Sequence, residues 1–498
     1  MGPTEQLEIE TKYDVAATVI LPALHELPGV ASVAQPVGLD LEAIYYDTAD
    51  LDLAAHKVTL RRRTGGEDDG WHVKFPVSSG ERLEVRHPLG RSTRAVPIAV
   101  VRTVRVHVRD RSLTPVVTLR THRIVHRLLD ADGAVLAELA DDNVTATVEG
   151  SEPESWREWE VELVGGDSAL LEEAGELLTA AGARPASGPS KLARALGDRV
   201  PAYDDWTLPK KPRTSDLFRA YAGAQVQAIR ERDPEVRRDV PDSIHKFRVA
   251  TRRLRSALAT YRPVIDREAG DALRVELKWL ASELGTARDA EVQREHFAAE
   301  VAEQPVELVI GRVAGRIDDH LRQVYKDGRA GALAALESPR YFRLLDALDE
   351  LVAKPPVIGD DDRKASKQIG DVLSHDYRRM RKAVRRSKAA PDVAEQDHEL
   401  HEVRKAAKRL RYAAESAVPV LGDDAGGLAA RAEEVQEILG AHQDSVVSRE
   451  LLHHLALMVY AEGGNTFTYG RLHATEEARG NTSRETFYEL WPTLKFKL

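Results

Sequence analysis

The sequence contains no cysteine, so the chain can form neither disulfide bonds nor thiolate metal sites. Aromatic residues make up only 5% of its 498 residues, which argues against stacking on nucleic-acid bases. No stretch approaches the roughly 20 apolar residues of a membrane-spanning helix, and residues 1–20 lack the pattern of a secretion signal. The formal net charge is −10, which argues against general attraction to nucleic acid. We therefore expect a cytoplasmic protein, in which any anion-binding site is a local concentration of Lys and Arg.

What the sequence does contain, in its first third, is the alternation of apolar and polar residues typical of β-strands. The alternation recurs at 58–63, 71–75, 82–86, 116–123, 135–141 and 156–163. Helices are predicted at 16–27 and 168–181. The spacing of the strands favours a barrel or a sandwich.

The remainder of the chain is predicted to be helical and internally duplicated. Apolar residues fall there at three- and four-residue intervals, after a proline-rich linker. Two segments of this part each return about 155 residues later along the chain: 245–255 as 401–411, and 284–289 as 439–444. The predicted organisation is a first domain at 1–200, a linker at 201–212, and a second domain at 213–498 with copies at about 213–355 and 365–498.

Charged residues occupy one face of several predicted strands. Glu8, Glu10 and Lys12 alternate with uncharged residues, so their side chains point to the same face. The later strands repeat this arrangement with Glu158, Glu160, Glu162, Arg61, Arg63, His72, Lys74, Arg82, Glu84 and Arg86. An ordinary solvated sheet with cross-strand ion pairs would explain any single strand. The repetition predicts instead a tunnel with a charged interior, in which carboxylates hold Mg²⁺ or Mn²⁺ and cationic side chains hold phosphates.

This part of the chain, roughly residues 3–200, resembles the CYTH domains, which are also called triphosphate tunnel metalloenzymes. The resemblance rests on Glu8-x-Glu10-x-Lys12, Tyr46-Asp47-Thr48, Leu60-Arg61-Arg62-Arg63, Lys74, Arg82-Leu83-Glu84, Glu158-x-Glu160-x-Glu162 and Ser190-Lys191-Leu192-Ala193-Arg194. It implies an eight-stranded antiparallel barrel that is open as a tunnel. It also implies hydrolysis of inorganic triphosphate, thiamine triphosphate or RNA 5′-triphosphates, or cyclisation of ATP.

The residues and the resemblance together give a set of candidate site residues. The predicted ligands for two divalent ions are Glu8, Glu10, Glu158, Glu160 and Glu162, with Asp141 as a further candidate. The predicted triphosphate ligands are Lys12, Arg61, Arg63, Lys74, Arg82, Arg123 and Lys191. Glu8, Glu10 and Lys12 are expected to be catalytic. Thr121 stands where many relatives carry Lys or Arg, two residues before Arg123.

In the helical part, basic residues form matching stripes in the two copies. His245, Arg248, Arg252 and Arg255 follow one another at helical spacing, and the second copy repeats the pattern from His401 to Arg411. Such stripes suggest a polyanionic partner, because like charges on neighbouring turns destabilise a helix. A solvated face paired with acidic helices is the alternative. The sequence has no His-Glu-x-x-His zinc motif.

The helical part, about residues 213–498, resembles the CHAD domain. The matching residues are the two His-x-x-Arg stripes, Leu284-Gly285-x-x-Arg288-Asp289 and Leu439-Gly440-x-x-Gln443-Asp444. The resemblance implies two four-helix bundles around a basic groove that binds inorganic polyphosphate. The candidate polyphosphate ligands are His245, Arg248, Arg252, Arg255, Arg288, Arg378, Arg381, Lys382, Arg385, His401, Arg404, Lys405, Lys408 and Arg411.

The sequence therefore predicts an α+β chain, with an eight-stranded antiparallel β tunnel and an all-α domain of duplicated four-helix bundles. The predicted function is metal-dependent hydrolysis of inorganic triphosphate or another short triphosphate, joined to polyphosphate binding, at cytoplasmic polyphosphate granules. Two alternatives remain open. One is a non-catalytic polyphosphate-binding or targeting protein. The other is a tunnel enzyme that acts on an organic triphosphate, by thiamine triphosphate hydrolysis or ATP cyclisation.

Overall fold

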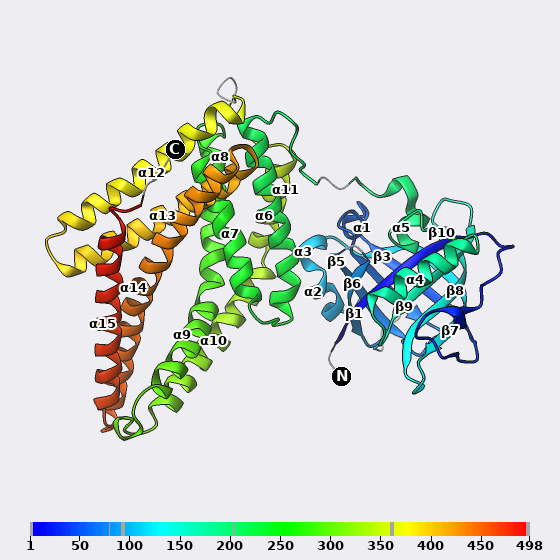
Figure 1. Ribbon diagram of the computed structural model, residues 1–498, viewed down its shortest axis with the longest axis horizontal. Coiled ribbons are helices and arrows are strands. Elements are labelled where there is room, and N and C mark those ends of the chain that lie inside the picture. Colours follow the sequence, from blue (N-terminus) through cyan, green and yellow to red (C-terminus); the bar gives the residue numbers. More distant parts are fainter. Residues whose placement is uncertain (1–2, 79, 91–94, 203–204, 359–362, 495–498) are drawn as a thin grey trace. The chain divides into compact units, whose positions relative to one another are not determined.

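The computed structural model describes residues 3–78, 80–90, 95–202, 205–358 and 363–494. The chain divides into two compact units, Met1–Asp204 and Asp205–Leu498 (Figure 1). The first is built from strands with a few short helices, and the second is built from helices.

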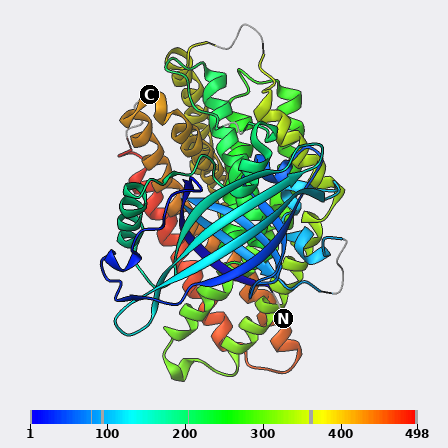
Figure 2. The ribbon, with the colours of Figure 1, turned by 90° about the vertical axis from the view of Figure 1, so that its right-hand side faces the viewer.

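The first unit is a closed antiparallel barrel. Its strands follow the order β1–β6–β5–β4–β3–β7–β8–β9, and β9 pairs with β1 to close the ring (Figure 2). Their bounds are β1 Thr4–Val15, β3 Val37–Asp47, β4 Thr59–Thr64, β5 Gly70–Ser78, β6 Glu81–His87, β7 Thr114–Leu129, β8 Val135–Val148 and β9 Glu154–Leu163. The short strands β2 (Ser32–Val33) and β10 (Arg184–Pro185) extend this sheet beside β7 and β1. The predicted eight-stranded antiparallel barrel is confirmed.

Helices cover the outside of the barrel, where the apolar side chains of the strands lie. Leu170, Ala174 and Leu178 of α4 (Ser168–Ala180) pack with Trp159 and Val161 of β9 in one buried cluster. The other helices of this unit are α1 Asp52–Ala55, α2 Ile98–Thr103, α3 Arg105–Val108 and α5 Lys191–Leu196. Burial of the apolar faces in this way leaves the charged faces of the strands to line the interior.

The helix predicted at 16–27 is wrong, whereas the helix predicted at 168–181 is present as α4. Within 16–27 only Leu24–Glu26 forms a single 3₁₀ turn. Pro22 lies in the middle of this stretch and has no backbone N–H to continue a helix. The carbonyl of Val19 instead accepts a hydrogen bond of 2.6 Å from Arg157 on β9.

The second unit is all-helical in its described residues, as predicted. Its helices are α6 Thr214–Arg237, α7 Ser243–Thr260, α8 Arg267–Glu283, α9 Gly285–Ala302, α10 Val313–Leu336, α11 Pro339–Ala353, α12 Ala365–Ala389, α13 Val393–Leu421, α14 Asp423–Ala461 and α15 Phe467–Leu490. No helix in the described part of the chain is long and apolar enough to cross a membrane.

Helices from the two halves of this unit pack together. Phe297 of α9, Ile317 of α10, Leu452 of α14 and Leu472 of α15 share one buried cluster. Elsewhere in this unit α7 packs against α13, and both helices bury their apolar faces. The basic stripes of α7 and α13 therefore belong to helices that are in contact.

Candidate active site

A cavity of about 390 Å³ runs inside the barrel. Every strand of the barrel contributes lining residues, because alternate side chains of each strand point inward. The predicted site residues that line it are Glu8, Glu10, Lys12, Arg61, Arg63, Lys74, Arg82, Arg123, Glu160, Glu162 and Lys191. Thus eleven of the twelve candidate metal and triphosphate ligands lie around one space, and only Glu158 does not line it.

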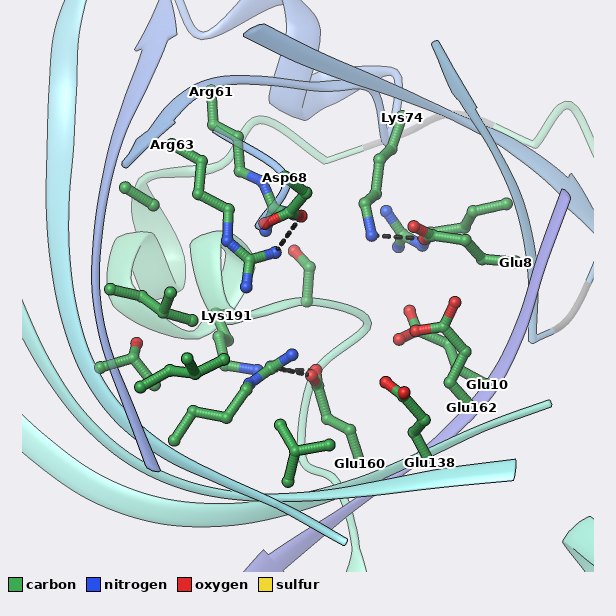
Figure 3. Close-up of a pocket in the computed structure, with 18 of the residues that line it drawn as sticks. Glu8, Glu10, Arg61, Arg63, Asp68, Lys74, Glu138, Glu160, Glu162 and Lys191 are labelled. Atoms are coloured by element: carbon green, nitrogen blue, oxygen red, sulfur yellow. Dashed lines mark hydrogen bonds and ion pairs between the residues drawn. The ribbon is translucent and has the colours of Figure 1, made fainter. Parts of the chain in front are cut away.

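The charges inside this tunnel are segregated. Figure 3 shows Glu8, Glu10, Glu138 and Glu162 gathered on one side, and Arg61, Arg63 and Lys191 on the other. The carboxylates come from β1, β8 and β9, whereas the arginines come from β4 and the lysine from the start of α5. A molecule that carries phosphates and divalent ions together would match both sides of this space.

The acidic side holds more negative charge than its own cations neutralise. Glu10 lies 3.0 Å from Lys12, and Lys74 donates to Glu8. Among the described residues Glu162 forms no ion pair. Burial, together with the nearby carboxylates of Glu8, Glu10 and Glu160, raises the pKa of Glu162 to about 7. Oxygen ligands from several carboxylates in one buried place fit Mg²⁺ or Mn²⁺, because these hard cations prefer such ligands.

The floor of the tunnel is organised around Lys191. Its ammonium lies 2.6 Å from both Glu158 and Glu160, and 3.0 Å from Asp142. Arg123 donates two hydrogen bonds to Asp142, of 2.7 and 2.6 Å, and one of 2.7 Å to Glu160. Asp142, Glu158 and Glu160 are close enough together to hold a metal ion, yet Lys191 already lies among them. The predicted ligand Glu158 is therefore covered by Lys191, and its other oxygen accepts from the indole of Trp156.

The basic side is crowded with guanidinium groups. Arg61 and Arg63 lie on β4, and Arg123 enters from β7. Burial and the charges of Arg61 and Arg123 lower the pKa of Arg63 to about 10. Asp68 binds Arg63 at 2.9 Å, Glu84 lies 3.5 Å from Arg61, and Asp142 and Glu160 hold Arg123. The charges of its cationic neighbours still destabilise Arg63, which favours an anion between these guanidinium groups.

Two further residues from the charged faces of the strands, Arg82 and His72, make contacts of different kinds. Arg82 donates a hydrogen bond of 2.9 Å to the carbonyl of Pro189, just before Lys191. His72 lies on β5, the strand that pairs with β6. It belongs to the charged face of β5, but its ring is buried between Glu84 and the carbonyl of Asp68. His72 thus fixes Glu84 in place and does not reach the cavity.

On β8 the sequence indicated the wrong aspartate. Asp141 lies on the opposite face, where Arg157 binds both of its carboxylate oxygens at 2.8 and 2.7 Å. Asp142, next to it, points inward to the floor, and Glu138 lines the cavity farther along. The pairing of Asp142 with Glu158 fixes this register. Because Asp141 and Asp142 are consecutive, the pair alone does not indicate which of them points into the barrel. The alternation of Glu138, Ala140 and Asp142 indicates that Asp142 shares a face with Glu138.

In the helical unit, the basic stripes of α7 and α13 meet. Arg252 donates a hydrogen bond of 3.1 Å to the hydroxyl of Tyr412 on α13. Arg248 lies against Gly285, and Arg404 lies in the same way against Gly440, so the two repeated motifs make matching contacts. In each copy the histidine lies beside the second repeated motif: His245 of α7 lies near Arg288 of α9, and His401 of α13 bonds Gln443 of α14.

Lys408 lies at the centre of the facing stripes. Burial, followed by the charges of Arg404, Arg252 and Arg248, lowers the pKa of Lys408 to about 7. Asp444 opposes this effect but does not cancel it. Repulsion between these cations thus raises the free energy of the folded protein, and an anion bound among them would reduce that repulsion.

The other predicted polyphosphate ligands are placed less centrally. Arg411 is bound by Glu415 and Glu433, each at 2.8 Å, and Lys405 is exposed beside Glu402. Arg255 lies near Arg274 and Arg252. The four cations of α12, namely Arg378, Arg381, Lys382 and Arg385, are exposed and form no ion pair with a described carboxylate. In the described residues no hydrogen bond or ion pair joins these four to the stripes, although α12 packs against α13.

Comparison with known proteins agrees with this architecture. Residues 6–196 match the family model of the CYTH domain, and residues 220–453 match that of the CHAD domain. An uncharacterized protein of Mycobacterium tuberculosis, strain CDC 1551, is 39% identical over 502 residues, which covers 97% of this chain and 95% of that protein. The chain belongs to the family of proteins in which a CYTH domain is followed by a CHAD domain.

Solved structures are similar to parts of the chain. The CHAD domain from the plant Ricinus communis is 26% identical and covers 58% of this chain and 95% of its own, with a TM-score of 0.46. A putative adenylyl cyclase from Hippeastrum, described as having a dominant triphosphatase activity, is 17% identical and covers 39% of this chain and 95% of its own, with a TM-score of 0.25.

Proposed function

We propose that the chain is a metal-dependent triphosphatase, which hydrolyses inorganic triphosphate or another short triphosphate inside the tunnel. The observation that carries this proposal is the segregation of buried carboxylates and buried cations around one cavity. Simple binding of an anion would require the cations alone. Glu8, Glu10, Glu138 and Glu162 add negative charge where an anion is to bind, which is sensible only if divalent cations accompany it.

The proposed mechanism assigns each side of the tunnel a part. Arg61, Arg63 and Lys74 bind the phosphate oxygens and stabilise the charge that develops on the transferred phosphoryl group and its leaving group. Glu8, Glu10 and Glu162 would hold Mg²⁺ or Mn²⁺, which when bound supplies charge neutralisation and a more acidic water molecule. Lys12 lies between Glu10 and Glu160, at 3.0 and 2.5 Å, and keeps these carboxylates ionised and in place.

For the helical unit we propose binding of inorganic polyphosphate between α7 and α13. Arg248 and Arg252 of α7 lie near Arg404 and Lys408 of α13. This arrangement supports polyphosphate binding, because it concentrates positive charge in a chain of net charge −10. A linear polyanion satisfies several of these cations at once. Polyphosphate granules in the cytoplasm are the proposed location, since that ligand would retain the protein there.

Phosphate release tests the catalytic proposal. Inorganic triphosphate, ATP, thiamine triphosphate and long-chain polyphosphate are each incubated with the full chain and Mg²⁺, Mn²⁺ or EDTA. We expect release from inorganic triphosphate that requires the metal ion. Faster turnover of thiamine triphosphate, or conversion of ATP to a cyclic product, would instead support a tunnel enzyme for organic triphosphates. No turnover of any substrate, with polyphosphate binding retained, would support the binding protein.

A further inference from the structure

Far along the chain from the tunnel residues, three potential metal ligands converge between α9 and α15. His296 and Glu300 are four residues apart and therefore share one face of α9. Glu476 reaches them from α15, and its carboxylate oxygen lies 2.6 Å from Nε2 of His296. One donor atom from each of the three residues falls within 4.8 Å of the others.

These groups are buried to a degree that is costly for carboxylates. The exposed fraction of Glu476 is 1%, and that of Glu300 is 4%. The second carboxylate oxygen of Glu476 has no hydrogen-bond partner within the described part of the chain. The cation present is the guanidinium of Arg479, which bonds Glu300 and lies 2.8 Å from Glu476. Two buried negative charges thus share one positive charge, and one buried oxygen is left unsatisfied.

The contacts of His296 conflict with one another. Its Nε2 atom faces the carboxylate oxygen of Glu476, which can only accept, and Nη1 of Arg479 at 3.0 Å, which can only donate. A single ring nitrogen cannot donate to the first and accept from the second at once. A lone pair on Nε2 that points at the same place as two carboxylates is instead the arrangement of a metal ligand.

We propose that His296, Glu300 and Glu476 form a binding site for a divalent transition-metal ion of the zinc class. The imidazole favours Zn²⁺ over Mg²⁺, and the two carboxylates balance the charge of the ion. The ion takes the place of the Arg479 guanidinium, whose side chain is 37% exposed and can turn to solvent. In the tunnel Lys191 lies among carboxylates in a comparable way, but its side chain is only 10% exposed and has no such exit. The bound ion would join α15 to α9.

Zinc binding is measured by titration calorimetry on the full chain carrying Glu8→Gln and Glu10→Gln, which weaken metal binding in the tunnel. We expect one zinc equivalent that is lost in His296→Gln and Glu300→Gln, and kept in His453→Gln, a histidine-to-glutamine control on α14. Co²⁺ in place of Zn²⁺ should give visible absorption bands that disappear with the same variants. Equal zinc binding in His296→Gln and in its parent would overturn the proposal.

Arg479→Gln separates a metal site from a simple ion-pair network. Removal of the competing guanidinium should strengthen zinc binding by at least tenfold, and zinc should restore the thermal stability that this variant loses. A network without a metal would lose stability in Arg479→Gln and gain nothing from zinc, and that result would also overturn the proposal. Because neither readout is phosphate release, failure here leaves the tunnel proposal untouched.

Discussion

The ammonium of Lys191 lies 2.6 Å from a carboxylate oxygen of Glu160 on the floor of the tunnel. Lys191 is the first residue of α5, outside the barrel strands, and its side chain reaches in to bind Asp142 and Glu158 as well. One residue from a helix thus supports three carboxylates from β8 and β9. The tunnel floor therefore depends on the position of α5.

Lys191→Met should destabilise the first unit by about 3 kcal/mol, because it leaves three buried carboxylates short of one cation. Chemical denaturation followed by tryptophan fluorescence measures the loss, and Lys191→Arg serves as the charge-retaining control. Since Arg123 would still bind Asp142 and Glu160, the barrel should remain folded. A change below about 0.5 kcal/mol would show that Lys191 has no supporting role.

Glu162→Gln and Glu158→Gln should differ in their effects, although both residues lie on the same face of β9. Glu162 forms no ion pair with a described residue, so its loss should weaken Mn²⁺ binding by at least tenfold with little change in stability. Glu158 is bound by Lys191 and Trp156, so its neutralisation should lower stability and leave Mn²⁺ affinity within about threefold. Calorimetry and thermal unfolding on both variants make the comparison. The reverse order would place the metal ion on the floor.

Polyphosphate binding should weaken as the pH rises above 7. Lys408 has a pKa of about 7 in the free protein, so above this pH the bound anion must draw a proton onto the amine. The affinity should fall by up to tenfold for each pH unit between 7 and 9, as measured by fluorescence anisotropy of labelled polyphosphate. Lys408→Arg, which stays charged, should remove this dependence. An unchanged slope in Lys408→Arg would contradict the assignment.

The lowered pKa of Lys408 also affects the stability of the helical unit. Because the folded-state pKa of Lys408 is lower than the unfolded value, the unfolded chain binds more protons between pH 7 and 10.5. Stability of the helical unit should therefore rise with pH through that window. Lys408→Met should stabilise the protein at pH 7 by about 1–2 kcal/mol while weakening polyphosphate binding. Destabilisation by Lys408→Met would show that the ammonium has a structural partner.

Arg252→Ala combined with Lys408→Ala should abolish polyphosphate binding and leave triphosphate hydrolysis within about twofold. The two residues lie on α7 and α13 of the helical unit and take no part in the tunnel. Lys278→Ala with Lys326→Ala, which are exposed on α8 and α10, gives a control variant with the same loss of charge. Equal loss of both activities in the first variant would refute the separation of roles.

The sequence predicted the barrel well where one face of a strand was charged and the other apolar. Alternation of period two places Glu8, Glu10 and Lys12 together whatever the rest of the chain does. It missed β3, where Leu39, Leu41 and Ala43 line the tunnel and alternate with Asp40 and Glu42 on the outer face. Alternation is present in this strand, but its apolar side chains point inward, which is the reverse of the charged interior predicted from the other strands.

The details of the site depend on long-range pairing that pattern cannot supply. Glu158 and Glu160 are equivalent in the sequence, and Lys191 binds both because of where α5 packs, yet only Glu160 lines the cavity. The choice between Asp141 and Asp142 required the register of β8 against β9. In the helices, the duplication predicted matching stripes on α7 and α13, whereas the ion pair between Arg411 and Glu433 of α14 could not be predicted.

Triphosphate hydrolysis by a carboxylate-deficient tunnel tests the central claim most directly. Glu8→Gln/Glu10→Gln is compared with Glu172→Gln/Glu176→Gln, which removes the same charge from the exposed face of α4. With Mn²⁺ and inorganic triphosphate, we predict a loss of at least a thousandfold in kcat for the tunnel variant and none for the α4 variant. Activity that is equal in both variants, or that survives EDTA, would contradict a metal-dependent reaction in the tunnel.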